Sequence, residues 1–399
     1  MDKTLSAIDY IELENQYGAK TYSPLDIIIE KGEGVWVYDI DGNKYLDCLS
    51  AYSCLNTGHC HPKIFEAMVE QAQKLTITSR AFRNQILSLF LKELSELTGK
   101  EAVLPMNTGA EAVETAVKLA RRWAYQVKGI EKYHAEIIVC ENNFHGRTTT
   151  ITSFSSEPAY KEGFGPFTQG FKIIPYGDAG ALRKAITPNT CAFLLEPVQG
   201  EAGIIIPPEG YLKEAEKICK ENNVLLMFDE IQTGFGRTGK LFAHQHEDVN
   251  PDVIIVGKAI SGGFYPVSAV LADNSVMDVL TPGSHGSTFG GNPLGCAIAR
   301  AALKVLKEEN LIQNSAELGK YFLDKLKTIN NPHIKDVRGK GLFIAIELDE
   351  PARPYCEALL KEGVLCKETH TYVIRVAPPL IITKDQIDWA FEKFQKVLS

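Results

Sequence analysis

Short apolar runs alternate with longer amphipathic stretches between about residues 50 and 290. Most of the short runs are β-branched or otherwise apolar throughout, as expected of strands buried on both faces of a sheet. In the longer stretches apolar residues recur every three or four positions, which predicts helices. We therefore expect an α/β fold with a mostly parallel sheet covered by helices. The expected strands are 135–141, 171–176, 192–195, 224–228, 253–256 and 267–271. The expected helices are 62–74, 85–97, 110–127, 211–222 and 293–309.

The pattern changes after residue 309. A helix is followed by a strand-like run at 341–348, short pieces of both kinds and an amphipathic helix at 384–398, which together predict a smaller α+β domain. The first 50 residues hold a pair of short strands, around 34–38 and 44–46, and are too few to fold alone. We expect three parts: an N-terminal segment (1–50) that docks on the small domain or on a partner subunit, a large domain (51–290) and a small C-terminal domain (291–399).

The composition is that of an ordinary soluble protein. The chain has 399 residues, 45% hydrophobic and 23% charged, which is enough for two or three domains. A net charge of -8 without a Lys/Arg block argues against nucleic-acid binding. Neither a signal-peptide pattern nor a run long enough to span a membrane is present in the sequence. The nine scattered cysteines then predict free thiols in a reducing cytoplasm.

The cluster His59-Cys60-His61 resembles a metal site at first glance. Neighbouring residues of an extended stretch point to opposite sides, so these three cannot close a tetrahedron around one ion. We expect a structural role for them and no metal in the protein.

Two residues of opposite charge follow predicted strands. Asp229 ends the run that begins at residue 224, and Lys258 follows the run at 253–256. Open α/β sheets bind ligands at the carboxyl ends of their strands. Pyridoxal phosphate (PLP) needs an amine to condense with its aldehyde and an acid to keep its ring nitrogen protonated, and these two residues suit it. From these residues alone, a plain structural ion pair is an equal alternative.

A strand-to-helix turn at 105–111 offers an anion site. Thr108 and Glu111 have the spacing of a capping box at the start of a long amphipathic helix. The free amides of the first helical turn could hold a phosphate, and Gly109 permits a close approach. A helix cap without a ligand is the alternative.

The sequence GFGRTG at 234–239 has the spacing of a dinucleotide fingerprint, so it supports a competing hypothesis, an NAD(P)-dependent oxidoreductase. That fingerprint should open a helix directly after the first strand of a βαβ unit. No good helix begins after residue 239, so we expect a glycine-rich loop near the active site.

Taken together, these residues make the chain resemble the fold-type I, class III PLP-dependent aminotransferases over essentially its whole length, and among them the ornithine aminotransferases. The segments that carry the resemblance are LSAYS (49–53), GHCHP (58–62), NTG (107–109), NFHGRT (143–148), EPVQGEAG (196–203), DEIQTG (229–234), GKA (257–259) and GSTFGGNP (286–293). His145 departs from it, since tryptophan is common there in animal members.

The resemblance implies roles around PLP in the large domain. Lys258 would hold the cofactor as a Schiff base and shuttle protons. Asp229 would pair with the pyridinium nitrogen, Phe144 would stack on the ring and Gln232 would bond the phenolic oxygen. The helix start formed by Thr108, Gly109 and Ala110 would hold the phosphate, and Thr288 would reach it from the partner subunit, so the resemblance implies a homodimer with shared active sites.

The resemblance also implies roles in substrate binding. Arg147 would bind the carboxylate of ornithine and later the distal carboxylate of 2-oxoglutarate. Arg375 would bind the α-carboxylate of the keto acid or of glutamate, and Glu201 would neutralise Arg375 while ornithine is bound. Tyr22 and Tyr52 would anchor the α-amino acid end of ornithine away from the cofactor.

The expected reaction is transfer of the δ-amino group of ornithine to 2-oxoglutarate, giving glutamate and glutamate 5-semialdehyde, which cyclises to pyrroline-5-carboxylate. Within the class, acetylornithine or another ω-amino acid is the alternative substrate.

Overall fold

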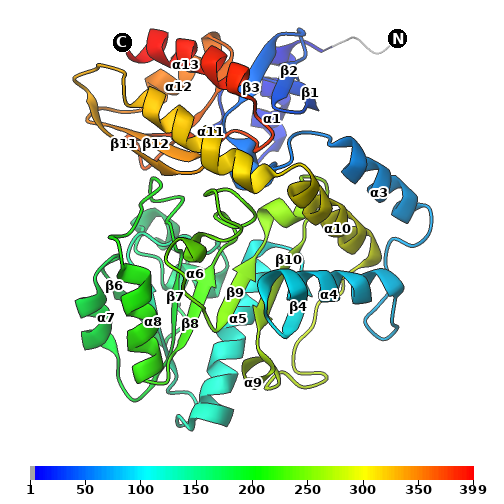
Figure 1. The fold of residues 1–399 in the computed structure, drawn as a ribbon, viewed down its shortest axis with the longest axis vertical. Helices are drawn as coiled ribbons and strands as arrows, with labels where there is room; N and C mark the ends of the chain where they lie inside the picture. The colour runs from blue at the N-terminus through cyan, green and yellow to red at the C-terminus, as the bar shows by residue number, and fades with distance from the viewer. Residues whose placement is uncertain (1–4) are drawn as a thin grey trace.

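Seven strands form the central sheet of the computed structural model, which describes residues 5–399 (Figure 1). The strand order is β4-β10-β9-β8-β7-β5-β6. Strands β5 to β9 pair in parallel, whereas β10 runs antiparallel to both of its neighbours. The sheet is therefore mostly parallel, as predicted. The strands are β4 (Ala102–Met106), β5 (Glu136–Cys140), β6 (Phe171–Ile174), β7 (Thr190–Leu195), β8 (Leu225–Asp229), β9 (Val253–Val256) and β10 (Ser268–Ala272).

Helices cover both faces of this sheet, which explains the uninterrupted apolar runs. In β9, Val253 and Ile255 pack in the cluster under α5, whereas Ile254 and Val256 belong to the core on the opposite face. One face carries α5 (Gly109–Trp123), α6 (Thr149–Ser153) and α9 (Asn274–Met277). The other carries α7 (Ala179–Ala185), α8 (Tyr211–Glu221) and α10 (Pro293–Glu308). Beyond the edge strand β4 lie α3 (Pro62–Ala72) and α4 (Gln85–Thr98) (Figure 1).

The predicted helix boundaries hold to within two residues except at the end of α5. The helix was expected to reach residue 127, but α-helical geometry ends at Trp123. The chain continues as one π turn, η1 (Ala124–Lys128), and stops at Gly129, whose left-handed φ of 79° lets its amide bond back to the carbonyl of Ala124. The apolar periodicity passes through both pieces, so it could not reveal the change.

A second sheet, in the order β11-β12-β15-β14, forms the C-terminal part above the large sheet (Figure 1). Its pairings are antiparallel. The elements after α10 are α11 (Leu311–Leu326), β11 (Ile334–Lys340), β12 (Phe343–Leu348), α12 (Arg353–Lys361), β13 (Val364–Leu365), β14 (Lys367–Thr369), β15 (Val373–Val376) and α13 (Lys384–Leu398).

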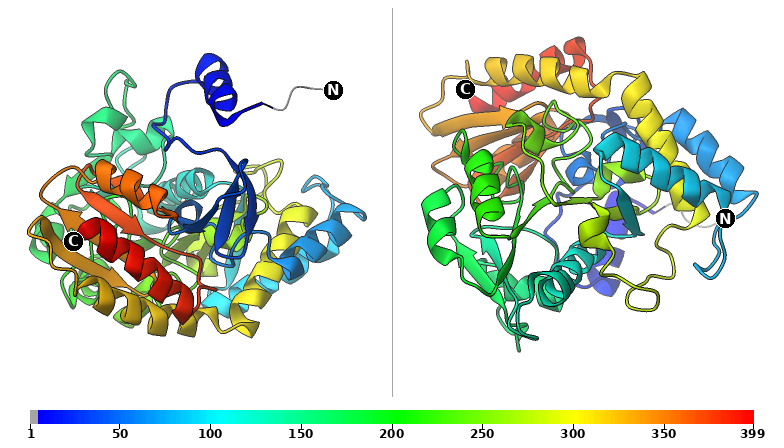
Figure 2. Two further views of the ribbon diagram at one scale, coloured as in Figure 1. Left: turned by 90° about the horizontal axis from the view of Figure 1, so that it is seen from above. Right: turned by 60° about the horizontal axis from the view of Figure 1, so that its bottom comes forward.

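The N-terminal residues join the C-terminal part through a small third sheet. Strand β3 pairs in parallel with β13, although more than 300 residues of sequence separate the two strands. The elements are α1 (Ala7–Tyr17), β1 (Ile29–Glu33), β2 (Trp36–Asp39) and β3 (Lys44–Asp47). Helix α1 buries none of its residues, and Figure 2 (left view) shows this dark blue helix standing clear of the rest. No helix within residues 5–399 is long and apolar enough to cross a membrane.

Arg237 connects the large-domain part of the chain with the C-terminal part from a fully buried position. Its guanidinium donates to the carbonyls of Leu342 (2.9 Å) and Pro378 (2.6 Å) and to Asn56 Oδ1 (2.6 Å). Burial lowers the pKa of Arg237 to about 9, against the opposing effect of the Asp47 charge. The buried cation is therefore held by oxygen acceptors contributed from distant segments.

Replacing Arg237 by methionine is expected to destabilise the protein by about 2–4 kcal/mol, because it leaves buried acceptors without a donor. Thermal and urea unfolding measure this change. Arg183→Met is the matched control: this half-exposed arginine pairs with Glu214 and Glu221 at the surface, so its loss should cost below about 0.5 kcal/mol. Equal effects of the two substitutions would contradict the role given to Arg237.

Candidate active site

A cavity of about 180 Å³ lies at the carboxyl ends of β8 and β9, where strand-end ligands bind in such sheets. It collects most of the residues that the sequence predicted for a cofactor. The lining residues are Gly109, Ala110, Phe144, His145, Gly146, Glu196, Val198, Asp229, Ile231, Gln232, Thr233 and Lys258.

Lys258 begins the 3₁₀ turn η4 (Lys258–Ser261) directly after β9. Its backbone has a positive φ of 43°, an unfavourable conformation for a residue with a side chain. Burial lowers the pKa of its amine, and the charge of Glu201 only partly opposes this. Within residues 5–399, Lys258 Nζ has no hydrogen-bond or ion-pair partner. The amine is therefore unpaired and shifted towards its neutral form.

Asp229 is the last residue of β8, and its carboxylate is buried. Oδ1 accepts the amide of Ile231 (3.0 Å), and Oδ2 lies 2.7 Å from His145 Nδ1. Burial alone would lower the pKa of His145, but the hydrogen bond to Asp229 raises it. His145 Nε2 is buried without a partner. No ion pair joins Asp229 to Lys258, which removes the structural alternative for these two residues.

Glu196 is a second buried carboxylate in the cavity wall, and it was not among the predicted site residues. It accepts the amides of Phe144 (3.0 Å) and Gly200 (3.3 Å), so it ties two loops of the site together. Burial raises the pKa of Glu196 to about 7, against the opposing effect of His145. The only sequence signal for a role of Glu196 was its position in the EPVQGEAG segment.

The N-terminus of α5 has the capping box that the sequence predicted. Thr108 Oγ1 accepts the amide of Glu111 (3.2 Å), and Glu111 Oε2 accepts the amide of Thr108 (2.8 Å). Gly109 and Ala110 then begin the helix at the cavity wall, and amides of a first turn have no partner inside the helix. This end of the cavity is therefore suited to a phosphate.

Arg147 lies outside the cavity, in an exposed position between two aromatic rings. Its Cζ is 4.0 Å from the ring centre of Tyr160 and 5.7 Å from that of Phe144. The two rings meet edge to face, with centroids 6.1 Å apart. Within the described residues no carboxylate pairs with this guanidinium, so it is free for a ligand carboxylate. Tyr160 was not among the predicted residues.

Arg375 is paired. Its Nη1 and Nη2 donate to the two oxygens of Glu201, at 2.8 and 2.9 Å, in a bidentate pair. Burial alone would raise the pKa of Glu201, but Arg375 overcomes it and lowers the pKa to about 2, so the pair is ionised at neutral pH. Gln232 Nε2 also donates to Glu201 (3.3 Å), and Thr369 Oγ1 donates to the Glu201 carbonyl.

Tyr52 belongs to an unusual left-handed turn, α2 (Ser50–Ser53), in which four successive residues without glycine have positive φ. Asp47 stabilises its start by accepting the amides of Leu49 and Ser50, both at 2.8 Å. The turn places the ring of Tyr52 5.2 Å from Arg375 Cζ. Burial raises the pKa of Tyr52, and Glu201 and Tyr22 are among the groups that add to the shift.

Two further predicted residues, Tyr22 and Thr288, also lie outside the cavity. Tyr22 is 86% exposed, and it lies close enough to Tyr52 to contribute to the raised pKa of that residue. Thr288 is exposed and does not line the cavity. Its neighbour Ser287 accepts a hydrogen bond from Asn107 Nδ2 (2.9 Å), which holds this segment beside the start of α5. The single chain therefore brings together the predicted cofactor residues except Thr288.

Comparison with known proteins decides the family. Residues 17–398 match the aminotransferase class-III family. The chain is 64% identical to the ornithine aminotransferase of Brevibacillus brevis over 388 residues, 97% of each chain.

Solved structures of aminotransferases are similar to this chain as well. The ornithine aminotransferase of Toxoplasma gondii, whose structure shows partial occupancy of PLP at the active site, matches with a TM-score of 0.98 and 45% identity over 98% of this chain and 94% of that one. The acetylornithine aminotransferase of Elizabethkingia anophelis matches with a TM-score of 0.91 and 49% identity over 99% of both chains.

This chain belongs to the class III aminotransferases.

Class III aminotransferases depend on PLP, and the cavity of this aminotransferase fits that cofactor. It presents an unpaired amine on Lys258, a buried carboxylate on Asp229 and the free amides at Gly109 and Ala110, with the ring of Phe144 on its wall. These groups correspond to the aldehyde, the ring nitrogen, the phosphate and the ring face of PLP. The fit rests on the chemistry of these side chains and backbone amides and does not depend on the family match.

The glycine-rich loop at 234–239 does not support the oxidoreductase hypothesis. It follows β8 as a series of turns and leads into the short 3₁₀ turn η3 (Ala243–His246), so no helix opens on it. The two histidines of the His59-Cys60-His61 cluster point apart: His59 Nε2 lies 2.8 Å from Asp47 Oδ2, and His61 Nε2 lies 3.3 Å from Glu309 Oε2. Within residues 5–399, no cluster of three or more His, Cys, Asp or Glu side chains is placed to hold a metal ion.

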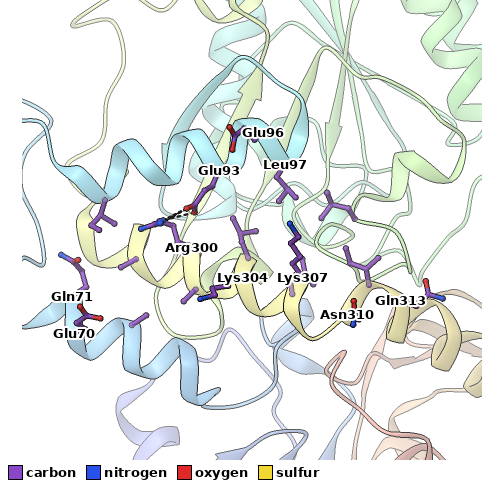
Figure 3. Close-up of a pocket in the computed structure, with 18 of the residues that line it drawn as sticks. Glu70, Gln71, Glu93, Glu96, Leu97, Arg300, Lys304, Lys307, Asn310 and Gln313 are labelled. Atoms are coloured by element: carbon purple, nitrogen blue, oxygen red, sulfur yellow. Dashed lines mark hydrogen bonds and ion pairs between the residues drawn. The ribbon is translucent and has the colours of Figure 1, made fainter.

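A larger groove, of about 1020 Å³, lies away from this site between α3, α4, α10 and α11 (Figure 3). Its floor is apolar, and its central cation, Arg300, is neutralised by Glu93 in a bidentate contact with distances of 2.7–3.0 Å. The lysines on its wall are exposed, and its described lining residues include no buried carboxylate like Asp229. Size therefore does not identify the active site of this aminotransferase, whereas side-chain chemistry does.

Proposed function

We propose that this aminotransferase transfers the δ-amino group of L-ornithine to 2-oxoglutarate, giving glutamate and glutamate 5-semialdehyde, which cyclises to pyrroline-5-carboxylate. The observation that carries the proposal is the bidentate pair between Arg375 and Glu201, beside an unpaired Arg147. The similarity to proteins named ornithine aminotransferase supports the same substrate.

The paired state suits ornithine, which has one carboxylate. Arg147 is the unpaired guanidinium of the two, so it binds that carboxylate, and the δ-amine at the other end extends towards Lys258. Tyr22 and Tyr52 anchor the α-amino acid end near the rim. Glu201 keeps Arg375 from attracting the carboxylate, and this favours the orientation in which the distal amine reaches the cavity.

2-Oxoglutarate and glutamate have two carboxylates and need both arginines. Arg147 then binds the distal carboxylate, and Glu201 swings away so that Arg375 binds the α-carboxylate. The exchange is chemically balanced, because one carboxylate replaces another on the same guanidinium. One pocket thereby accepts two substrates of different shape.

PLP supplies, when bound, the aldehyde and the electron-withdrawing ring that stabilise charge at the substrate carbon. The residues of the chain do the rest. Lys258 would hold the cofactor through Nζ and then carry the proton to and from the substrate carbon, Asp229 would keep the ring nitrogen protonated, and Gln232 would bond the phenolic oxygen. The amides of Gly109 and Ala110, capped by Thr108, would hold the phosphate.

We also propose a homodimer in the cytoplasm. Thr288 is exposed, and Asn107 holds its segment beside the start of α5. In a dimer, Thr288 of one subunit would reach the phosphate in the site of the other subunit. The nine free cysteines suit a reducing compartment.

A substrate panel tests the proposed function. Wild-type enzyme with 2-oxoglutarate as acceptor should use ornithine with a kcat/KM at least about tenfold above that for acetylornithine or 4-aminobutyrate, a difference of about 1.4 kcal/mol. Acetylornithine has its α-amine acylated, so a preference for it would favour the second substrate and reject the anchoring by Tyr22 and Tyr52. A colourless protein that binds NAD would reject the class of reaction altogether.

Glu201→Gln should reverse the order of substrates. The amide cannot neutralise Arg375, so the free guanidinium should attract glutamate more strongly and misorient ornithine. We expect the ratio of kcat/KM for glutamate to that for ornithine to rise by about tenfold or more. Single-turnover measurements of each half-reaction give the two constants separately. An unchanged ratio would mean that Glu201 does not control access to Arg375.

A further inference from the structure

Few contacts of its own hold Tyr22 in place. It lies in the irregular stretch between α1 and β1, in which residues 18–24 are all exposed. Helix α1 buries no residue, and the backbone bonds of this stretch are local, such as Thr21 N to the Ala19 carbonyl (2.8 Å). Side-chain packing therefore does not fix the position of the residue proposed to anchor ornithine.

Two cations from the C-terminal part clamp the chain directly after Tyr22. Arg353 donates from Nη1 to the Ser23 carbonyl (3.0 Å) and from Nη2 to the Pro24 carbonyl (2.7 Å). Lys367 Nζ donates to the same Ser23 carbonyl (2.9 Å). Charged donors on neutral carbonyls make stronger bonds than neutral ones. Pro24 adds rigidity, because its ring fixes φ and restricts Ser23 to extended conformations.

The two cations are themselves held in place. Glu368 Oε1 accepts from Lys367 Nζ (2.7 Å) and from Arg353 Nη1 (3.3 Å), and Glu357 accepts from Arg353 Nε (2.7 Å). The side chains of Arg353, Lys367 and Glu368 are 28%, 23% and 20% exposed, so the cluster is only partly screened by solvent. We name these three residues the Ser23 clamp.

The Ser23 clamp is continuous with the substrate site. Lys367 is the first residue of the edge strand β14, and it lies opposite Arg375 in the pairing with β15. Thr369, at the other end of the same strand, donates to the carbonyl of Glu201. One three-residue strand thus connects the backbone beside Tyr22 with the Glu201 and Arg375 pair, and Tyr22 lies close enough to Tyr52 to affect its pKa.

We propose that Arg353 and Lys367 are specificity-determining positioning residues, which hold Tyr22 against the α-amino acid end of ornithine. The inference rests on the proposed function, because it assigns Tyr22 to that substrate. Neither cation contacts the cavity, so both act through the backbone of Ser23 and Pro24. Loss of the clamp should release Tyr22 and weaken discrimination between ω-amino acids, while the chemistry at Lys258 stays intact.

The test compares ornithine with 5-aminopentanoate, which has the same chain and carboxylate but no α-amino group. In Arg353→Met/Lys367→Met, kcat/KM for ornithine should fall by about 10- to 100-fold, mainly through KM. The constants for 5-aminopentanoate and for glutamate should stay within about twofold. Arg353→Lys keeps the positive charge but loses the fork that reaches both carbonyls, so it should give an intermediate loss. Arg183→Met, which removes a surface arginine with similar ion pairs, should change nothing.

A double-mutant cycle shows whether the clamp acts through Tyr22. Tyr22→Phe alone should reproduce the loss for ornithine, and adding Arg353→Met to it should cause little further loss. Additive losses, or an equal loss for all three substrates, would overturn the inference and leave the clamp a purely structural feature. If the wild type does not prefer ornithine to 5-aminopentanoate, the proposed function fails instead. The thermal midpoint of each variant shows that it is folded, and the single substitution Lys367→Met serves if the double variant is not.

Discussion

Replacing Lys258 by alanine is expected to lower turnover with both ornithine and 2-oxoglutarate by about 10⁴-fold or more, because one amine has two roles. It would attach the cofactor, and it would move the proton at the substrate carbon. No other described lysine lines the cavity, so none can replace it. The lowered pKa of Lys258, caused by burial, favours the neutral amine that both roles require.

Four measurements separate this effect from misfolding. The variant should keep the circular dichroism and thermal midpoint of the wild type but lose the visible absorbance of the covalently bound cofactor. Borohydride reduction of the wild type should place a pyridoxyl group on the peptide that contains Lys258. Lys240→Ala is the control: this exposed lysine lies outside the cavity, and its variant should be fully active. Turnover by Lys258→Ala above one per cent of wild type would reject the assignment.

The central sheet and the ends of its strands could be predicted because their signals are local. A strand covered on both faces is apolar at every position, and the residue that ends it is the first polar one. This rule located Asp229 at the end of β8 and Lys258 shortly after β9. The capping box of Thr108 and Glu111 is likewise a local signal, and the structure forms it.

The contacts that complete the site are long-range, and no local pattern encodes them. His145 meets Asp229 over 84 residues of sequence, and Arg375 meets Glu201 over 174. The family resemblance suggested the second pair, but it passed over His145, which departs from the common residue. The cations of the Ser23 clamp lie about 330 residues from Ser23, and their carbonyl acceptors have no side-chain signature at all.

The left-handed turn of Tyr52 could not be predicted either. Four successive positive φ values normally call for glycine, yet Ser50, Ala51, Tyr52 and Ser53 contain none. The surrounding structure determines the turn: Asp47 accepts the amides at its start, and Ser50 Oγ donates to the carbonyl of Ala377 (2.7 Å). A turn of this kind depends on contacts with the C-terminal part of the chain, which no local sequence pattern reveals.

Replacing Asp229 by asparagine is expected to lower kcat in both half-reactions by about 10²–10³-fold. The amide has the shape of the carboxylate but no charge, so it cannot keep the cofactor's ring nitrogen protonated. His145 sharpens the prediction, because its pKa is raised by the carboxylate of Asp229. In the variant that interaction is lost, and the buried imidazole should become neutral, so no compensating charge remains beside the ring. Affinity for PLP should fall as well, which a titration of the apoenzyme measures.

Glu230 is the matched control for Asp229, because the two carboxylates are adjacent, buried and hydrogen-bonded to a histidine. Glu230 accepts from His244 Nδ1 (2.8 Å) and from the amide of Ala243 (3.0 Å), but it does not line the cavity. Glu230→Gln should therefore lower the thermal midpoint while kcat of the folded enzyme stays within about twofold. If Glu230→Gln lost as much kcat as Asp229→Asn, both carboxylates would be structural and the ring nitrogen would need another partner.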